Sequence, residues 1–520
     1  MASFILTSAF TAISLYIGTA ASLGPVTSLT LTNGPVTPDG FTREAVLVNG
    51  VTPGPPITGY KGDNFQINVQ NELQDHSMNR TTTVHWHGLF QHHTNWADGT
   101  AFVTQCPIAS HNSFLYDFNV PDQAGTFWYH SHESYQYCDG LRGPFIVYDP
   151  DDPYADLYDV DNESTIITLT DWYHIPTAQV PIPSNSEAVL INGLGRQAND
   201  TTSPLSVITV TQGKRYRFRL ISMACEAYFN FSIDNHTVTI IEADGQSTQP
   251  LPGIDSIEIF AAQRYSFILE ANQTIGNYWI RASPENVAVG TTPLPPPPGM
   301  AILRYVGAPD EEPTTISFTN HPLNESDLRA YGNHPVPGEP YPGGADVNIN
   351  LDFFFNFTDG LFYVNNHTFQ SPSVPVLLQI LHGDYSPWDL MPEGSIYGLP
   401  PNKSVEISMP GGVIGGPHPL HLHGHSFSVV RSAGQLTPNY DNPVIRDTVS
   451  IGLAGDNVTI RFDTNNPGPW FLHCHIDFHL NTGFAVVMAE DTYATPYVDA
   501  PPLEWDALCP IFDALPISDH

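Results

Sequence analysis

Short apolar runs bounded by turn residues recur along the whole chain, and no long stretch has the 3.6-residue period of an amphipathic helix. The segments YRFRLI (216–221) and VTIRF (458–462) alternate apolar and polar residues, as half-buried strands do. Further strand-like runs are FQINV (65–69), IITLT (166–170), VTII (238–241) and YSFIL (265–269). Together with 48 prolines and 40 glycines, which indicate many turns, the pattern predicts an all-β protein of sandwiches or barrels.

Three segments share one arrangement of residues: GTFWYHSH (125–132), GNYWIRAS (276–283) and GPWFLHCH (468–475). In each, aromatic residues follow a glycine, and polar residues stand five and seven positions after it. The polar positions are histidines in the first and third segments, but Arg281 and Ser283 in the middle one. We therefore expect three related β domains, of which the middle one has no metal ligands.

Two stretches rich in proline and acidic residues, 149–161 and 307–314, separate these segments. They divide the chain into a first domain (23–152), a second domain (153–312) and a third domain (313–520). Before them, residues 4–21 are uncharged, mostly apolar and end in small residues, which is typical of a secretory signal peptide. We expect residues 1–22 to be that peptide, a buried N-terminal element being the alternative. No other run reaches the 18 apolar residues of a membrane helix.

The glycosylation motif N-x-S/T also favours export, because it occurs eleven times. Its asparagines are Asn79, Asn162, Asn199, Asn230, Asn235, Asn272, Asn324, Asn356, Asn366, Asn402 and Asn457. We expect a secreted glycoprotein, in which disulfides are permitted. Of the five cysteines, four could pair, which leaves one for another role.

The charge balance excludes some partners. Against 17 lysines and arginines stand 53 acidic residues, so the formal net charge is −36. Phosphate backbones and anionic lipids bind clustered cations, so we expect no binding of nucleic acid or membranes. The 41% hydrophobic content argues against disorder. The unusual feature of the composition is its 22 histidines.

Ten of these histidines fall into four clusters, namely His85 and His87; His130 and His132; His418, His421 and His423; and His473, His475 and His479. Side chains at positions i and i+2 of a strand point to the same face, so each H-x-H segment presents two imidazoles to one place. Four such segments supply eight imidazoles. Because one metal takes three or four nitrogen ligands, eight indicate several metals, and a three-metal cluster fits the count.

Cys474 lies between His473 and His475 and must point to the opposite face of the same strand. It therefore needs a metal site of its own, for which His418 and His479 are the nearest unassigned histidines. Two histidines and a cysteine are the ligands of a type 1 (blue) copper. Zinc also accepts both residue types, but a structural zinc site needs only four ligands, and no H-E-x-x-H motif occurs.

The segments HWHG (85–88), HSH (130–132), HPLHLHGH (418–425) and HCHIDFH (473–479) resemble the four copper motifs of the multicopper oxidases. The segments FWYHSH (127–132), QYCDGLRGPF (136–145) and AAQRYSF (261–267) resemble those of fungal laccases in particular. The resemblance implies three consecutive cupredoxin-like Greek-key domains and four copper ions. It also implies one-electron oxidation of phenols or aromatic amines, with reduction of O₂ to two waters.

Matching positions imply the copper ligands. Type 1 copper takes His418, Cys474 and His479; type 2 copper takes His85 and His421; the type 3 pair takes His87, His130 and His475, and His132, His423 and His473. Phe484 stands at the axial type 1 position, ten residues after the cysteine, and cannot coordinate, which implies a high redox potential. The resemblance also implies the disulfides Cys106–Cys509 and Cys138–Cys225, although four cysteines alone allow three pairings.

Four acidic residues join these candidates. By resemblance, Glu226 receives the substrate proton near the type 1 site, where many relatives carry aspartate, and Asp98 delivers protons near the cluster. Asp477 could support the ligands around it. Glu133 follows HSH where relatives usually carry an apolar residue. As the strand neighbour of His132 it should point away from the cluster, as a solvated or paired acid.

These observations predict a monomeric, secreted laccase-type enzyme that acts on small phenols or aromatic amines and O₂, with lignin or other phenols as candidate substrates. One alternative is a multicopper oxidase with another donor, such as ferrous iron, ascorbate or bilirubin. A second alternative is a copper carrier without catalysis. A carrier would need only the blue site, and the eight remaining histidines argue against it.

Overall fold

The computed structural model describes residues 22–285, 293–516 and 518, so the expected signal peptide lies almost wholly outside the described residues. All six strand-like runs of the sequence lie in strands, which confirms the all-β expectation. The strand β4 shows why: in NFQINVQN, burial alternates from one residue to the next, so the apolar residues pack inward and the polar ones face outward.

The first domain has two four-stranded sheets, ordered β2-β1-β4-β6 and β3-β8-β7-β5. Its strands are β1 (Val26–Val36), β2 (Arg43–Val48), β3 (Ile57–Tyr60), β4 (Asn64–Asn71), β5 (His85–His87), β6 (Asn112–Asn119), β7 (Gly125–His130) and β8 (Arg142–Tyr148).

The second domain has a seven-stranded sheet, β11-β10-β9-β13-β18-β15-β16, and a five-stranded sheet, β12-β20-β19-β14-β17. Its strands are β9 (Ile166–Trp172), β10 (Ala188–Ile191), β11 (Leu194–Gly195), β12 (Val207–Val210), β13 (Arg215–Ser222), β14 (Tyr228–Ile233), β15 (Val238–Ala243), β16 (Gln246–Ile254), β17 (Ile257–Ile259), β18 (Arg264–Glu270), β19 (Asn277–Glu285) and β20 (Gly299–Tyr305).

The third domain has two five-stranded sheets, β21-β25-β30-β27-β28 and β24-β32-β31-β26-β29, and the hairpin β22–β23. Its strands are β21 (Val347–Asn350), β22 (Phe353–Asn356), β23 (Leu361–Val364), β24 (Ile396–Leu399), β25 (Ser404–Pro410), β26 (Pro419–Leu422), β27 (Phe427–Arg431), β28 (Ile445–Arg446), β29 (Thr448–Ser450), β30 (Asn457–Asp463), β31 (Gly468–Cys474) and β32 (Ala485–Glu490). Its short helices are α1 (Val376–Leu381), α2 (Pro387–Leu390), α3 (Asp477–Leu480), α4 (Thr495–Val498), α5 (Leu503–Asp506) and α6 (Leu508–Asp513).

The three glycine-aromatic segments form equivalent strands of the three domains. They form β7, β19 and β31, and each is the third strand in an identical run: β3-β8-β7-β5, β12-β20-β19-β14 and β24-β32-β31-β26. In every run the first two strands are parallel and the others antiparallel. The repeated topology confirms three related two-sheet domains.

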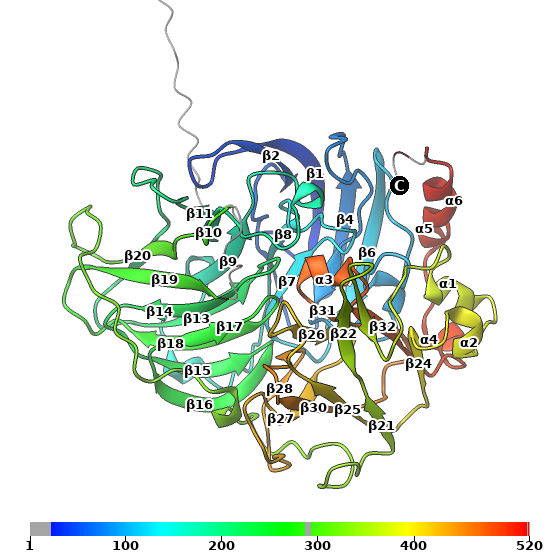
Figure 1. Cartoon of the computed structure of the whole chain (residues 1–520). Helices are drawn as coiled ribbons and strands as arrows, with labels where there is room; N and C mark the ends of the chain where they lie inside the picture. The colour runs from blue at the N-terminus through cyan, green and yellow to red at the C-terminus, as the bar shows by residue number, and fades with distance from the viewer. Residues whose placement is uncertain (1–21, 286–292, 517, 519–520) are drawn as a thin grey trace, which may run out of the picture.

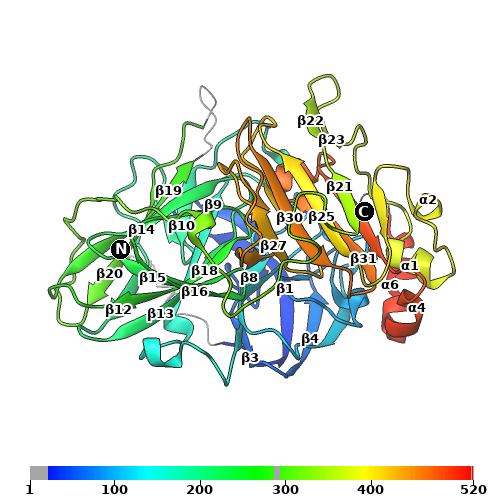
Figure 2. The ribbon, with the colours of Figure 1, turned by 90° about the horizontal axis from the view of Figure 1, so that it is seen from below.

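Figure 1 shows the second domain at the left, with the first and third domains against each other at the right. Figure 2 shows the same grouping from below. The chain's last helices return to the first domain, where Trp505, Leu508 and Phe512 pack into its core and Cys509 is bonded to Cys106. Among the described residues, no helix is both long and apolar enough to span a membrane.

Candidate metal centre

The histidine clusters meet where the first and third domains touch. Strand pairing sets His85 opposite His130 in the first domain and His421 opposite His473 in the third. The second histidine of each H-x-H segment lies just beyond a strand end, except His87, which is on β5. Across the interface, the ring of His87 stacks on His421 with centroids 3.8 Å apart, and His85 stacks on His423 at 3.9 Å.

All eight side chains are buried, and their nitrogens form compact groups. Within each group, one nitrogen per residue lies within 4.8 Å of the others; the groups are His85, His87 and His421; His87, His130 and His475; and His132, His423 and His473. The last two are the two type 3 sets that the resemblance implied, and the first contains the type 2 pair.

The ring nitrogens are turned so that metals fit between them. The Nδ1 atoms of His85, His130 and His421 donate to the carbonyls of Asp98, Ser131 and Asp447 at 2.7, 2.8 and 2.9 Å. Their Nε2 atoms are buried and have no hydrogen-bond partner. The same is true of Nε2 of His132 and of both ring nitrogens of His475. His87 is reversed: its Nδ1 has no partner and its Nε2 lies 3.2 Å from Asp447 Oδ1. When a backbone carbonyl accepts a hydrogen bond from one ring nitrogen of a histidine, the other ring nitrogen remains available to bind a metal.

Burial also favours the neutral form of six of these histidines. It lowers the pKa of His87, His130, His423, His473 and His475 well below the usual value, and neighbouring histidines add to the effect. Burial lowers the pKa of His132 to about 3. A neutral imidazole is the form that binds metals, so the donor set suits several copper ions.

Two buried carboxylates hold the cluster from either side. Asp98 Oδ2 accepts hydrogen bonds from His423 Nδ1 at 2.9 Å and from the hydroxyl of Thr100 at 2.7 Å. Asp447 faces His87 and accepts two hydrogen bonds from Arg264 at 2.8 and 2.7 Å. Burial alone would raise the pKa of Asp447, but Arg264 and His87 hold it well below its usual range.

A separate site forms around Cys474. Its Sγ lies 3.6 Å from Nδ1 of His418 and 3.7 Å from Nδ1 of His479, and the two Nδ1 atoms are 3.1 Å apart. Burial lowers the pKa of His418 to about 4 and raises that of the Cys474 thiol. A buried thiolate needs a cation close to it, and a copper ion between these three atoms would supply one.

The axial position of this site is apolar. Phe484 is fully buried, with its ring 5.1 Å from that of His418 and stacked on Phe362 at 5.0 Å. Phe362 in turn packs against His479 at 4.6 Å. Neither phenylalanine offers a donor atom, so the atoms that could hold a metal here are two nitrogens and one sulfur.

Comparison with known proteins decides the family. Multicopper oxidase sequence profiles match residues 30–152, 163–308 and 369–493. The chain is 61% identical to Laccase-1 of Fomitopsis schrenkii, over 98% of this chain and 97% of that one.

The chain belongs to the multicopper oxidase family.

It is a laccase-type member: it couples one-electron oxidation of donors to the reduction of O₂, and membership implies four coppers. The crystal structure of a Botrytis aclada laccase matches with a TM-score of 0.81, at 30% identity, over 96% of this chain and 94% of that one. A multicopper oxidase that functions in iron import matches with a TM-score of 0.82, at 27% identity, over 95% and 96%. The three domains are therefore cupredoxin-like, as expected.

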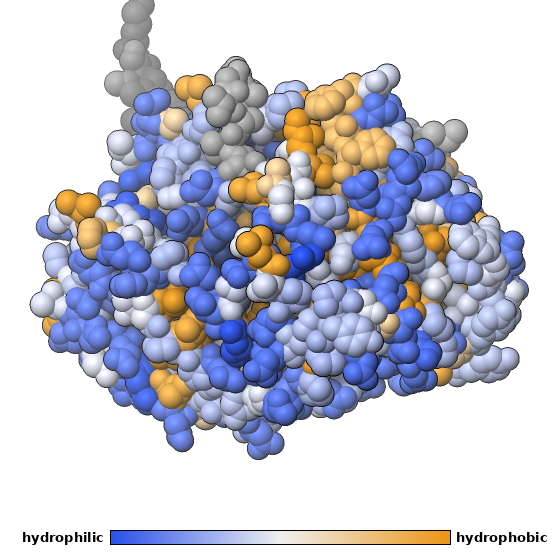
Figure 3. Space-filling view, turned by 60° about the horizontal axis from the view of Figure 1, so that its bottom comes forward, coloured by the Kyte–Doolittle hydropathy of each residue, from blue (hydrophilic) through white to orange (hydrophobic). Residues whose placement is uncertain are grey.

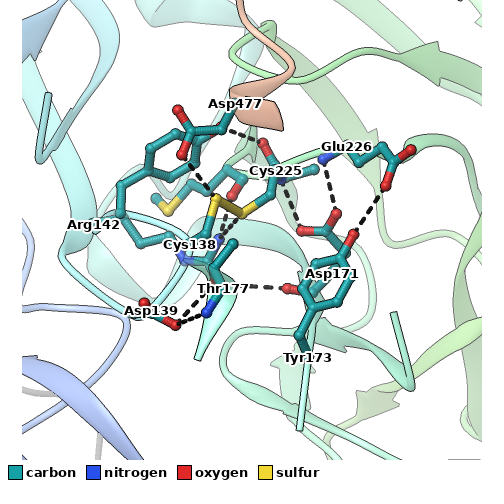
Figure 4. Close-up of a disulfide and its surroundings, with 12 residues drawn as sticks. Cys138, Asp139, Arg142, Asp171, Tyr173, Thr177, Cys225, Glu226 and Asp477 are labelled. Atoms are coloured by element: carbon teal, nitrogen blue, oxygen red, sulfur yellow. Dashed lines mark hydrogen bonds between the residues drawn. A yellow bond between two sulfur atoms is a disulfide. The ribbon is translucent and has the colours of Figure 1, made fainter. Parts of the chain in front are cut away.

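In this multicopper oxidase, Glu226 follows Cys225 in the loop between β13 and β14 of the second domain (Figure 4). The carbonyl of Cys225 accepts a hydrogen bond from the N–H of Asp477, two residues before His479. The Oε2 atom of Glu226 accepts a hydrogen bond from the hydroxyl of Tyr173 at 3.2 Å. Its backbone N–H donates to Asp171 at 2.9 Å, so the start of the loop is fixed. Burial, and then the charge of Asp171, raises the pKa of Glu226 to about 8.

The disulfide Cys138–Cys225 joins the first domain to the loop of the second domain that carries Glu226 (Figure 4). It and Cys106–Cys509 are the pairs that the resemblance implied, and Cys474 is the free cysteine. Asp477 lies against this disulfide, with Oδ2 3.3 Å from Sγ of Cys138, and its N–H donates to the carbonyl of Cys225 at 2.9 Å. Burial and two nearby aspartates raise the pKa of Asp477 well above its usual range.

Glu133 differs from the expectation. It follows the end of β7 instead of lying on the strand, so the alternation of side chains along β7 does not extend to it. Its residue exposure is only 8%, and with His132, Phe471 and Asn481 it lines a cavity of about 370 Å³. Burial raises its pKa to about 7. Of the two expected forms, a solvated or a paired acid, the solvated one is wrong, because Glu133 is buried beside His132.

Three supporting residues were not found from the sequence as site residues. Asp447 and Arg264 hold His87 and His421, and Tyr173 holds Glu226. One signal was present: Asp447 follows Arg446 inside an apolar strand-like run, where a charge needs a buried partner. The identity of that partner depends on the packing of the domains.

Proposed function

We propose that the two metal groups divide the laccase reaction between an electron-entry site and an oxygen site. The entry site is His418, Cys474 and His479, as type 1 ligands. The oxygen site has His85 and His421 as type 2 ligands, and His87, His130 and His475 with His132, His423 and His473 as type 3 ligands. Copper bound there supplies one-electron acceptors and the centre at which O₂ becomes water. Cys474 is bonded through the chain to His473 and His475, so one residue on either side connects the two sites.

Phenols and aromatic amines are the proposed donors, because the surroundings of the entry site are apolar and aromatic. Hairpin β22–β23 covers it with Phe362, while Phe357 between the two strands is 77% exposed. Ile414, close in sequence to His418, is 53% exposed. In Figure 3, apolar residues gather at the upper right of a mostly hydrophilic face, in the region where Figure 2 shows this hairpin. An aromatic ring gains from burial against such side chains.

Glu226 is the proposed acceptor of the donor's proton. It lines a small crevice with Tyr173, Ala227 and Glu285. A phenol that loses an electron becomes a strong acid, so a carboxylate within hydrogen-bond distance lowers the barrier to oxidation. Tyr173, itself a phenol hydrogen-bonded to Glu226, shows that the carboxyl group accepts a phenolic O–H in this position.

Asp98 is the proposed proton donor for oxygen reduction. Its carboxylate is buried, is within 2.9 Å of His423, and has one oxygen, Oδ1, without a hydrogen-bond partner. Asp477, which lines the histidine cavity with His130 and His475, is proposed to support the ligands there. Phe484 is proposed to raise the potential of the entry site, because no axial donor stabilises the oxidised metal.

The proposed donor class separates this chain from oxidases of ferrous iron, ascorbate or bilirubin. The shared fold does not distinguish between these donors, because the iron-import oxidase matches the structure of this chain as well as the Botrytis aclada laccase does. Oxygen uptake with a phenol, compared with ferrous iron, ascorbate and bilirubin, tests the proposal. A phenol should be the best donor by kcat/KM, and faster uptake with ferrous iron would overturn it.

We further propose export as a monomeric glycoprotein, with phenols outside the cell, lignin among them, as substrates. None of the eleven N-x-S/T asparagines is buried, which supports glycosylation. The net charge of −36 supports the absence of nucleic-acid and membrane binding. The proposed domain boundaries after residues 152 and 312 fall between the last strand of one domain and the first strand of the next, β8 and β9 or β20 and β21, which supports them. The proposed cleavage after residue 22 precedes β1. Mass spectrometry of the secreted chain and its glycopeptides tests the cleavage site and the glycans.

A further inference from the structure

A buried ion pair joins the middle domain, which has no metal ligands, to the histidine cluster. Arg264 begins β18 in the middle domain, and its NH1 and NH2 donate to the two carboxylate oxygens of Asp447 at 2.8 and 2.7 Å. Asp447 lies between β28 and β29 of the third domain. The two side chains are 0% and 1% exposed. A bidentate pair with so little contact with water has a fixed geometry.

Asp447 contacts two histidines of the cluster through different atoms. Its Oδ1 lies 3.2 Å from Nε2 of His87, and its backbone carbonyl accepts a hydrogen bond from Nδ1 of His421 at 2.9 Å. These contacts leave Nδ1 of His87 and Nε2 of His421 without a hydrogen-bond partner, facing the shared space. The position of one aspartate therefore determines which nitrogen each ring offers to a metal.

Arg264 is itself held by all three domains. Its Nε donates to the carbonyl of Thr126 in the first domain at 3.0 Å, and its NH1 also donates to that of Ala262 in its own domain at 3.1 Å. Thr126 is on β7, the strand that carries His130. The guanidinium thus lies where the three domains meet, and its plane is fixed by contacts to each.

The glycine of HWHG makes room for the pair. Gly88 has φ of +90°, and a Cβ there would lie 2.8 Å from Asp447 Oδ2 and collide with NH2 of Arg264. A larger residue would push the ion pair away from His87. This motif therefore accommodates the arginine and aspartate as well as supplying two ligands.

We propose that Arg264 is a positioning residue of the oxygen site: through Asp447 it sets the ring orientation of His87 and His421 and so the affinity for cluster copper. This inference rests on the proposed ligand roles of those histidines. Without the arginine, Asp447 would lose two charge-assisted hydrogen bonds and be free to turn away from His87.

The neighbouring pair Arg446–Asp244 provides a matched control. Arg446 is fully buried, and its Nε and NH2 donate to Asp244 at 2.8 and 3.1 Å across the same two domains. Its side chain has no hydrogen bond to a cluster histidine or to the carboxylate of Asp447. Asp244 also accepts a hydrogen bond from the backbone N–H of Arg264 at 2.8 Å, but Arg446→Lys keeps a cation beside Asp244. We therefore expect Arg446→Lys to weaken the same interface while the bidentate Arg264–Asp447 pair stays in place.

The experiment compares the copper-loaded parent, Arg264→Lys, Arg446→Lys and His421→Ala during titration with a copper chelator. Total copper, the blue band and the electron paramagnetic resonance of the non-blue copper are followed together. Arg264→Lys should lose cluster copper at a chelator concentration about 10–100-fold lower than the parent, with an altered non-blue signal and an unchanged blue band. Arg446→Lys should keep its cluster copper like the parent.

The inference would be overturned if Arg264→Lys retained cluster copper as well as the parent does. It would also be overturned if Arg446→Lys lost as much cluster copper as Arg264→Lys. His421→Ala separates this failure from failure of the ligand assignment, because that variant must lose copper if the assignment holds. If Arg264→Lys does not fold, Asp447→Asn replaces it. The amide of Asp447→Asn keeps an oxygen for His87 but cannot accept both hydrogen bonds from Arg264. We therefore expect the same selective loss of cluster copper. Retention of that copper at the parent level would refute the inference.

Discussion

The Sγ atom of Cys474 lies 3.7 Å from Nδ1 of His479, which follows five residues later on α3. The backbone closes the same loop, because Phe484 N–H donates to the carbonyl of His479 at 3.1 Å and Cys474 N–H donates to that of Phe484 at 3.0 Å. Eleven consecutive residues, 474–484, therefore contain two of the three proposed type 1 ligands and the apolar axial side chain. Changes in this segment should alter the entry site without disturbing the fold of the sheets.

Replacing Phe484 with methionine should lower the potential of the blue copper. A thioether at the axial position stabilises the oxidised metal, and we expect a fall on the order of 60 mV or more, a tenfold change in a one-electron equilibrium. Redox titration of the blue band measures it. Phe353→Met is the control: its ring is 5.0 Å from that of Phe484, so the packing changes in the same region. An equal fall in both variants would show that packing, not ligation, sets the potential.

Replacing Glu226 with glutamine should affect phenols more than donors that release no proton. Because its pKa is raised to about 8, the carboxylate fraction grows as the pH rises toward that value. In the parent, kcat/KM for a phenol relative to a non-phenolic donor should therefore rise with pH, and Glu226→Gln should flatten that rise and lower the phenol value about 10–100-fold. Glu285→Gln, in the same crevice, should match the parent. Equal losses for both donor types would exclude the proton role.

Asp98→Asn should slow oxygen reduction without slowing donor oxidation. The amide lacks the transferable proton, so we expect kcat to fall about 10–100-fold. Stopped-flow bleaching of the blue band by a phenol in the absence of O₂ should stay at the parent rate. Asp441→Asn, the same substitution at an exposed position, serves as the control. Slower anaerobic bleaching in Asp98→Asn would move its role from the oxygen site to electron entry.

Asp499 should make the protein less stable as the pH rises. Burial raises its pKa from 3.8 to about 7, although the N–H groups of Trp96 and Asn95 oppose the shift. Between those values the folded chain binds a proton that the unfolded chain has released, so the contribution is complete below about pH 4 and lost by about pH 7. The loss is at most roughly 4 kcal/mol.

Asp499→Asn should remove this part of the pH dependence, so its free energy of unfolding relative to the parent should increase from pH 4 to pH 7. Denaturant unfolding at the two pH values measures the difference. Glu504→Gln, at an exposed position in the same C-terminal segment, should leave the slope unchanged. A parent-like slope in Asp499→Asn would show that this carboxyl is not protonated in the folded protein.

Much of the metal centre follows from local spacing. Alternation in VTIRF and the shared glycine-aromatic segments predicted strands, and the position of Cys474 between two histidines predicted its separate site. These are properties of a few neighbouring residues on one strand, so the sequence contains them directly. The disulfide pairs and the division of ligands among coppers needed the family resemblance, since spacing alone leaves several pairings open.

What the sequence could not provide depends on contacts between distant segments. Asp447 faces His87 from 360 residues away, and Arg264 reaches it from another domain. Glu133 was expected to point away from the cluster, as a solvated or paired acid, because the strand was assumed to continue past His132, but β7 ends at His130. A strand end displaced by a few residues reverses the direction of a side chain, so its burial could not be derived from alternation.

The most direct test of the proposed reaction is its stoichiometry in the purified chain. Total copper and the ratio of one-electron donor oxidised to O₂ consumed are measured on one preparation, with assay of hydrogen peroxide. We expect four coppers per chain, four donor molecules oxidised for each O₂, and no peroxide. One copper per chain, no oxygen uptake, or peroxide as the product would contradict an oxygen site built from these eight histidines and supplied through Cys474.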